Sequence, residues 1–443
     1  MKNAKGISCE MIQKFKANYN NDKMAKVLTA AVSKADLAEA AYSPADAAKM
    51  ENCFSIDLHC GTATSQQASG RCWLFASMNV MREIIMKKCN IAHFELSGNY
   101  FAFWDKFEKI NYCLESIIDT ADKSLEDRTV NWILHNAIGD GGQWDMMVSL
   151  VKKYGVVPKS VMPETYQSSH TRTLMGKING KLRKCAKELR ALVAEGKDPQ
   201  PRKEEMLEEF FKALCICFGM PVENFDFQYE DKDGKYHVDR NLTPVEFFNK
   251  YVGMELDNYV SIINAPTSDK PFHKTYTVAY IGNVVNEPIC YLNLPMDEMK
   301  ALTVAQMKDG EVVWFGSDCG KFGSRAEGIW DPDSFVFDEL LGGLDLSMTK
   351  EESLDFCNSA MNHAMVLTGV NLDENEQPNR WKIENSWGPD AGQKGYFIAS
   401  DKWFDLQTYQ VIINKKYLTD EQKAALAEEP IVLNPWDPMG TLA

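Results

Sequence analysis

The feature that most constrains this fold is a run of small residues that leads directly into a helical apolar pattern. Residues 65–79 read SQQASGRCWLFASMN. After Arg71, apolar side chains recur at steps of three and four positions, which predicts a helix with one buried face. These side chains are Leu74, Met78, Met81 and Ile85. Because Gly70 and the small residues before it do not favour a helix, Cys72 is predicted on the first turn of the helix.

The length of the chain calls for more than one hydrophobic core. With 443 residues, two or three packed units are expected. A hydrophobic share of 45% and a charged share of 25% are typical of a globular protein. The formal net charge of -15 argues against nucleic acid as the main partner.

The N-terminus and the cysteines indicate a reducing compartment. The first residues, MKNAKGISCEMIQKFKANYNND, hold no apolar segment long enough for a signal peptide. No stretch approaches the roughly 18 apolar residues of a membrane-spanning helix. We therefore expect a cytoplasmic protein that does not bind membranes. The 12 cysteines are scattered without disulfide or C-x-x-C spacing, so most should be reduced, buried thiols.

The rest of the chain reads as helical and extended segments in turn. Helices are predicted in the first fifty residues and, on both sides of the helix-breaking sequence DPQP, from about 171 to 220. The sequence FDFQYEDKDGKYHV predicts a hairpin at its Asp-Gly pair. Three strands are expected in HAMVLTGVN, RWKIENSWG and GYFIAS. The tail closes with a helix, DEQKAALAEE, and a proline-broken arm, PIVLNPWDPMGTLA.

A cysteine at a helix start has part of what a nucleophile needs. A thiol attacks carbonyl groups as thiolate, which the free N–H groups of a helix N-terminus favour, as does a protonated imidazole. His363, one of seven histidines, opens the strand-like run HAMVLTGV, and Asn385 follows another such run in ENSWG. The Asn385 amide can orient the imidazole, and Trp387 can keep water from that hydrogen bond.

The loop before the helix offers donors for the oxyanion of an acyl-transfer reaction. The backbone N–H of Cys72 and the side-chain amide of Gln66 would form a two-donor oxyanion hole. The competing interpretation of Cys72 is a buried structural thiol. His363 alone would be interpreted as a hydrogen-bonded core histidine. The chain offers a nucleophile, a base, a residue that orients the base and an oxyanion donor, and their occurrence together favours the catalytic interpretation.

Three blocks of the sequence resemble those of a known enzyme family. QQASGRCWLFA, NHAMVLTGV and ENSWG resemble the catalytic blocks of papain-type cysteine peptidases, in the order glutamine, cysteine, histidine, asparagine. SGRCW, VWFGSDCGKFG and the terminal PWDPMGTLA are similar to the bleomycin hydrolase and aminopeptidase C branch. The resemblance covers almost the whole chain. One departure is Gln67-Ala68 in place of a Lys-Ser type pair, which leaves Gln66 in register.

The resemblance implies an α+β, papain-like two-lobe fold. A helical lobe would carry Cys72 and a β-rich lobe would carry His363 and Asn385, with a helical insertion and a C-terminal arm added. The implied parts are an N-terminal helical segment at 1–58, the cysteine lobe at 59–170, a helical and hairpin insertion at 171–262, the β-rich lobe at 263–418, and a C-terminal helix and arm at 419–443.

The resemblance also implies the activity of a cysteine aminopeptidase. Such an enzyme hydrolyses the N-terminal peptide bond, or a small amide bond, through a thioacyl-enzyme intermediate. The turn formed by Gly141, Gly142 and Gln143 would line the substrate cleft. Trp73, next to the nucleophile, and Trp387 would support the site.

The C-terminal arm would convert the open cleft of an endopeptidase into that of an aminopeptidase. In this family the arm lies in the cleft of its own chain, so the carboxylate of Ala443 would attract the ammonium group of the substrate. The resemblance further implies hexameric rings. We therefore expect a homohexamer that acts on peptides with a free N-terminus.

Other chemistries fit the sequence less well. GSDCGK lacks the spacing and the Ser or Thr of a phosphate loop, and DENEQPNR is interpreted as a hairpin connection and not as a calcium loop. No histidine and cysteine spacing fits zinc, so no metal or cofactor is expected. The alternatives are a papain-like endopeptidase or acyltransferase with an open cleft, and a binding or storage protein with vestigial catalytic groups.

Overall fold

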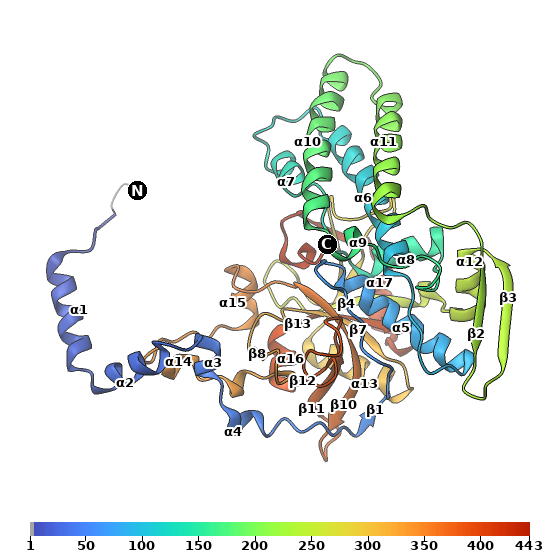
Figure 1. Ribbon diagram of the computed structural model, residues 1–443. Coiled ribbons are helices and arrows are strands. Elements are labelled where there is room, and N and C mark those ends of the chain that lie inside the picture. The colour runs from blue at the N-terminus through green and yellow to red at the C-terminus, as the bar shows by residue number, and fades with distance from the viewer. Residues whose placement is uncertain (1–3) are drawn as a thin grey trace.

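The N-terminal segment is helical and extends away from the rest of the molecule (Figure 1). The computed structural model describes residues 4–443. The helices of this segment are α1 (Cys9–Asn21), α2 (Lys23–Val32), α3 (Leu37–Ala41) and α4 (Pro44–Ala47). Helices α1 and α2 bury no residue, whereas α3 packs against α14 (Phe337–Leu340). The predicted helices of the first fifty residues are confirmed.

The next part of the chain is mostly helical and contains the helix predicted after the small-residue loop. Its helices are α5 (Cys72–Cys89), α6 (Gly98–Asp119), α7 (Arg128–Asn136), α8 (Trp144–Tyr154), α9 (Tyr166–Ser169), α10 (Arg172–Ala194) and α11 (Gln200–Phe218). Helices α10 and α11 both pack on α6 and project from the body as a pair (Figure 1). The DPQP sequence lies at the break between them, as predicted.

A hairpin follows α11. Its strands are β2 (Phe225–Glu230) and β3 (Tyr236–Leu242), and they pair antiparallel around the turn that contains Gly234. Gly234 has a φ of 77°, which glycine adopts without steric cost. The predicted hairpin is confirmed. Short elements lead from it into the sheet, namely α12 (Pro244–Phe247), η1 (Phe248–Val252) and η2 (Leu256–Asn258).

The second half of the chain forms a large, mostly antiparallel sheet. Its order is β14-β5-β6-β4-β13-β7-β10-β11-β12-β9-β8, and β1 also pairs with β10. The strands are β1 (Ile56–Asp57), β4 (Tyr259–Ile263), β5 (Lys274–Val278), β6 (Tyr291–Asn293), β7 (Val313–Ser317), β8 (Gly323–Ser324), β9 (Ile329–Trp330), β10 (His363–Leu372), β11 (Pro378–Glu384), β12 (Tyr396–Ser400), β13 (Thr408–Asn414) and β14 (Ile431–Leu433). The three strands predicted from sequence are β10, β11 and β12.

Helices between and after these strands complete the fold. They are α13 (Met296–Lys308), η3 (Pro332–Ser334), α14, α15 (Lys350–Asp355), α16 (Asp401–Gln407), η4 (Lys415–Tyr417), α17 (Asp420–Leu426) and η5 (Pro438–Gly440). Helix α17 is the helix predicted in the tail. No helix in residues 4–443 is long and apolar enough to cross a membrane.

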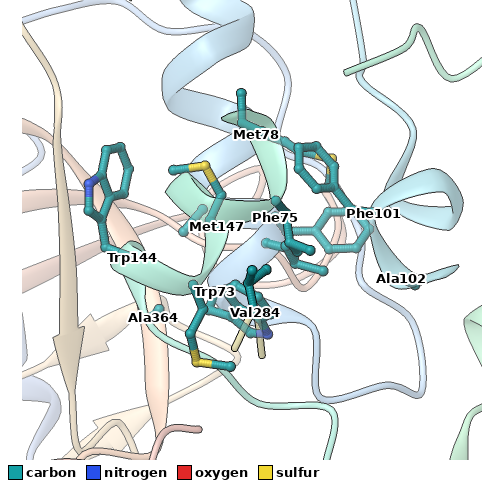
Figure 2. Close-up of a cluster of buried hydrophobic side chains, with 14 of the residues drawn as sticks. Trp73, Phe75, Met78, Phe101, Ala102, Trp144, Met147, Val284 and Ala364 are labelled. Atoms are coloured by element: carbon teal, nitrogen blue, oxygen red, sulfur yellow. The ribbon is translucent and has the colours of Figure 1, made fainter. Parts of the chain in front are cut away.

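The sheet has a hydrophobic core on each face because successive side chains along each strand point to opposite faces. In β10, Ala364 and Val366 join the core formed with α5, α6 and α8, while Met365 and Leu367 join the core formed with α13 and α16. Figure 2 shows part of the first core, in which Trp73 from α5 lies among side chains of neighbouring elements. The mixture of helices and a separate sheet is the α+β class predicted from sequence.

Candidate active site

Cys72 is the first residue of α5, as the small-residue loop before it predicts. The thiol-bearing residue is 4% exposed. Arg71 occupies the N-cap position and gives no side-chain hydrogen bond to the helix. The first N–H groups of α5 are therefore free to act on an anion at Cys72.

His363 and Asn385 meet at the same end of two neighbouring interior strands. His363 begins β10 and Asn385 directly follows β11, and these strands pair antiparallel. The imidazole Nε2 and the Asn385 Oδ1 are 2.8 Å apart. Because an amide oxygen only accepts hydrogen bonds, Nε2 carries a proton, and Nδ1 of the neutral ring is left as a base.

Trp387 covers this histidine. Its ring is stacked on the imidazole, with centroids 5.1 Å apart and an interplanar angle of 29°. His363 is 5% exposed and Asn385 is fully buried. The tryptophan therefore lies where the sequence places a shield for the His–Asn hydrogen bond.

The first turn of α5 reaches the beginning of β10. Helix α5 packs against β10 and β7, and the indole N–H of Trp314 in β7 donates to the backbone oxygen of Trp73 at 3.2 Å. The backbone N–H of Ala364, the residue after His363, forms a hydrogen bond to the Cys72 sulfur and thereby lowers the pKa of the thiol. The sheet thus brings the histidine strand to the cysteine from the far half of the sequence.

Burial shifts the pKa values of Cys72 and His363, in each case toward the neutral form of the group. It raises the pKa of Cys72 to about 11, although backbone N–H groups of Ala364, Trp73 and Cys72 itself lower it. Burial lowers the pKa of His363 to about 4, against the effect of its hydrogen bond to Asn385. Both shifts favour a neutral thiol and a neutral imidazole, and the ionisation of Cys72 that the helix N-terminus favours stays a prediction.

Gln66 is held by the segment that carries Asn385. Its backbone N–H donates to the Ser386 oxygen at 2.8 Å, and its Oε1 accepts from the Ser386 hydroxyl at 2.6 Å. Its Nε2 donates to the Ser69 carbonyl oxygen at 2.6 Å. Since an amide nitrogen carries two hydrogens, one N–H of Gln66 remains for an oxyanion.

Arg71 supports the same loop, a role that sequence reasoning missed. Its side chain is fully buried, donates to the Ser69 hydroxyl at 2.9 Å and binds both carboxylate oxygens of Glu164 at 3.1 and 3.0 Å. The signal in the sequence was an arginine directly before the cysteine. Its partner lies 93 positions away and could not be assigned from spacing.

Asp140 is a second supporting residue that the sequence did not identify. Its carboxylate accepts from the Gly70 N–H at 3.1 Å and forms a 2.8 Å ion pair with buried Lys106. Its backbone oxygen accepts from the Trp73 indole at 2.8 Å. Burial raises the pKa of Asp140, but Lys106 outweighs that effect and holds the pKa well below its usual value.

The predicted substrate turn lies against the end of the chain. A Cβ atom added to Gly141 would lie 2.0 Å from the Leu442 carbonyl oxygen, and one added to Gly142 would lie 2.4 Å from the Trp73 ring. Only glycine fits at either place. Gln143 is fully buried directly before α8, and its role in substrate binding stays a prediction.

The C-terminal arm is packed along its length and is not frayed. The Arg128 guanidinium lies 3.8 Å from the Trp436 ring centroid, and Asp437 pairs with Lys270 at 2.9 Å. The Thr441 hydroxyl donates to the Met361 oxygen at 2.8 Å, two residues before the histidine. Leu442 is 4% exposed. The arm therefore runs from the outer helices to the neighbourhood of His363.

The chain is similar to known peptidases over its full length. The profile of the Peptidase C1-like family matches residues 6–440. Aminopeptidase C of Listeria innocua and that of Streptococcus thermophilus are each 47% identical, with 99% of both chains covered. The crystal structure of PepW from Lactobacillus rhamnosis HN001 matches with a TM-score of 0.97 at 48% identity, over 99% of each chain. These findings confirm the resemblance and the papain-like α+β fold predicted from the sequence: the chain belongs to the Peptidase C1-like family.

Proposed function

We propose that the chain is a cysteine aminopeptidase, which removes single residues from the free N-terminus of peptides or hydrolyses small amides. The full-length relatives named aminopeptidase C support this activity. The observation that carries the proposal is the contact between the end of the arm and the Gly141 turn. An arm in this position shortens the cleft on one side of the nucleophile, and only the first residue of a substrate then fits.

In the proposed mechanism His363 moves one proton in each half-reaction. Its Nδ1 accepts the proton of the Cys72 thiol as sulfur attacks the carbonyl carbon, and then gives that proton to the leaving amine. The backbone N–H of Cys72 and the free N–H of Gln66 stabilise the oxyanion. A water molecule deprotonated by His363 then hydrolyses the thioester, and Asn385 keeps the ring oriented throughout.

Burial is consistent with a resting neutral pair that becomes an ion pair during the reaction. Transfer of the proton from Cys72 to His363 creates two opposite charges next to each other, which costs less than creating either charge alone in the buried site. The thiolate and the developing oxyanion are then stabilised by the free N–H groups of α5. All of these steps use groups of the chain itself.

The arm is proposed to recognise the ammonium group of the substrate. The carboxylate of Ala443, half-buried beside the Gly141 turn, would pair with that group, and the backbone of Leu442 would exclude further residues. Substrates with a blocked N-terminus would lose this ion pair and meet a steric barrier. Specificity for N-terminal residues would therefore arise from the chain's own last residues.

Deletion of residues 440–443 tests this function. We expect the turnover of an aminoacyl-arylamide to fall and the cleavage of an N-acylated peptide to appear or rise. The Cys72→Ser variant of each form is the control for contaminating peptidases. An unchanged ratio of the two activities would remove the arm from the proposal. Transfer of the acyl group to an added amine in place of water would favour the alternative of an acyltransferase.

We also propose that the protein is a cytoplasmic homohexamer. Free thiols at all 12 cysteines support a reducing compartment. The exposed apolar side chains of α1 and α2 support association, because isolated apolar faces of this kind mark interfaces. They are Met11, Ile12, Phe15, Tyr19, Met24 and Val27.

A further inference from the structure

A second cluster of reactive side chains lies beside the middle of α5. It consists of Cys60 in the loop before the active-site loop, Glu83 in α5 and Glu384 at the end of β11. The Cys60 sulfur and one carboxylate oxygen from each glutamate all lie within 4.8 Å of one another. The proposed peptidase mechanism uses none of these three residues.

Glu384 has a carboxylate oxygen without a donor. The residue is 1% exposed. Its Oε1 accepts from the Asn79 amide at 3.0 Å and from the Arg82 guanidinium. Its Oε2 is buried and accepts no hydrogen bond from residues 4–443. Since a buried carboxylate oxygen is costly to leave without a partner, this atom is in place for a cation.

Glu83 is oriented toward the same point by other donors. Its Oε1 accepts from the Gly61 N–H at 3.1 Å and from the Arg82 Nε at 3.1 Å. These bonds fix the carboxylate and leave its second oxygen available. The loop residue before Gly61 is Cys60, so one short segment both orients Glu83 and supplies the sulfur.

Among the residues that the structure describes, the cation that pairs with this cluster is Arg82. This guanidinium faces two carboxylates. The nearby Lys382 is engaged elsewhere, in a 2.7 Å ion pair with Asp57. Two carboxylates and a thiol that can ionise therefore outnumber one cation. A divalent cation that displaces the thiol proton would balance the charge.

We propose that Cys60, Glu83 and Glu384 form a binding site for a thiophilic divalent cation such as Zn²⁺. Zn²⁺ binds thiolate sulfur at about 2.3 Å and carboxylate oxygen at about 2.0–2.2 Å, and three atoms within 4.8 Å of one another would need to move only slightly to surround such an ion. On binding, Cys60 releases its proton to solvent and its sulfur bonds to the metal. Water completes a four-coordinate site.

The site is open to solvent on one side. Cys60, Gly61 and Glu83 line a surface cavity of about 1210 Å³, whereas Glu384 lies behind them, inside the protein. An ion therefore has an entry path and a position for a water ligand. The site also joins two catalytic elements, since α5 begins with Cys72 and Glu384 precedes Asn385. Its expected role is to brace α5 against β11, with no part in the chemical step.

Zn²⁺ binding to the Cys72→Ser protein tests the proposal without interference from the catalytic thiol. We expect one Zn²⁺ per chain in equilibrium dialysis and a melting temperature that rises with Zn²⁺ concentration. Cd²⁺ should give a thiolate-to-metal charge-transfer band in the ultraviolet. Because the protein tested is inactive, the result does not depend on the proposed peptidase function.

Matched variants in the same background locate the ion. Cys60→Ser should abolish the charge-transfer band and lower the affinity at least tenfold, and Glu83→Gln should lower the affinity. Cys53→Ser, which removes an exposed cysteine, should leave both unchanged. Equal binding by the Cys60 and Cys53 variants would overturn the proposal, as would the absence of Zn²⁺ binding in the parent. If Cys60→Ser does not fold, the band of the parent and its response to Glu83→Gln decide.

Discussion

The Cys72 thiol lies at the start of a helix and inside a closed cleft, and these surroundings change its pKa in opposite directions. The free N–H groups lower the pKa, but burial has the larger effect and raises it to about 11. The same burial lowers the pKa of His363 to about 4. At the scale of single residues, burial therefore has the largest effect on both pKa values, and in the proposed mechanism the ion pair forms during the reaction.

The pH dependence of kcat/KM follows from these directions. Because the pKa of His363 is lowered, its imidazole stays neutral and able to accept a proton as the pH falls below the usual value of about 6.5. We expect activity to persist down to about pH 5 and to be lost as the pH approaches 4. The alkaline limb should reflect the substrate amine, near pH 8, since the thiol ionises later. An acid limb at pH 6.5 would contradict this.

In the proposed mechanism Asn385 orients the imidazole of His363. Asn385→Ala removes the acceptor 2.8 Å from Nε2 and should lower kcat/KM by about 10²-fold. Asn385→Asp keeps an acceptor and adds a negative charge, so it should retain more activity. It should also move the acid limb to higher pH, because the charge favours imidazolium. Equal pH profiles in the two variants would show that the hydrogen bond has no such role.

At the scale of elements, one turn contacts both the nucleophile helix and the end of the chain. Asp140 accepts from Gly70 and Trp73, while the next residue, Gly141, touches Leu442. Lys109 in α6 donates to the Gly141 oxygen. The position of the terminal carboxylate relative to the Cys72 sulfur is therefore fixed by a short, buried and charged connection.

A methyl group at Gly141 should loosen the arm without deleting it. The new Cβ of Gly141→Ala would clash with the Leu442 backbone, whereas that of Gly139→Ala meets its nearest neighbour at 3.8 Å, an ordinary contact. We expect Gly141→Ala to raise KM for aminoacyl-arylamides and to increase cleavage of N-acylated peptides. Gly139→Ala should leave both near their original values. The same kinetics in both variants would contradict a role of the turn in seating the arm.

The loop before Cys72 depends on the ion pair between Arg71 and Glu164. Glu164→Gln would leave a fully buried guanidinium without its counter-charge, and we expect a loss of up to about 3 kcal/mol in the free energy of unfolding. The exposed pair of Lys159 and Glu95 provides the comparison, since Glu95→Gln should cost less than about 1 kcal/mol. Urea denaturation measures both. Similar losses would show that Arg71 is not held mainly by Glu164.

At the scale of the whole molecule, the sequence predicted local elements better than the contacts between distant ones. The helix at Cys72 and the strands at His363 and before Asn385 follow from apolar periodicity, so spacing was sufficient. The partners of Asp140 and the depth of the cleft depend on segments packed together only in the folded chain, so no local pattern indicated them. The five-part division of the chain and the catalytic roles stay predictions.

The exposed N-terminal helices give a prediction for the assembled protein. If α1 and α2 hold neighbouring subunits, a chain without residues 1–33 should sediment as a smaller species than the full chain in analytical ultracentrifugation. Phe15→Ser with Met11→Ser should weaken the assembly, because both side chains are exposed and apolar. Unchanged sedimentation would assign the assembly, if any, to other surfaces.

Helix α5 is held to the sheet at its first turn and again near its middle. Trp73 at its first turn bonds to Trp314 of β7, and Arg82 binds Glu384 of β11. Because α5 is held to the sheet at these two points, the Cys72 sulfur keeps its position while the sheet is intact. Heat inactivation and the loss of near-ultraviolet circular dichroism should then coincide, with no folded but inactive form surviving between them.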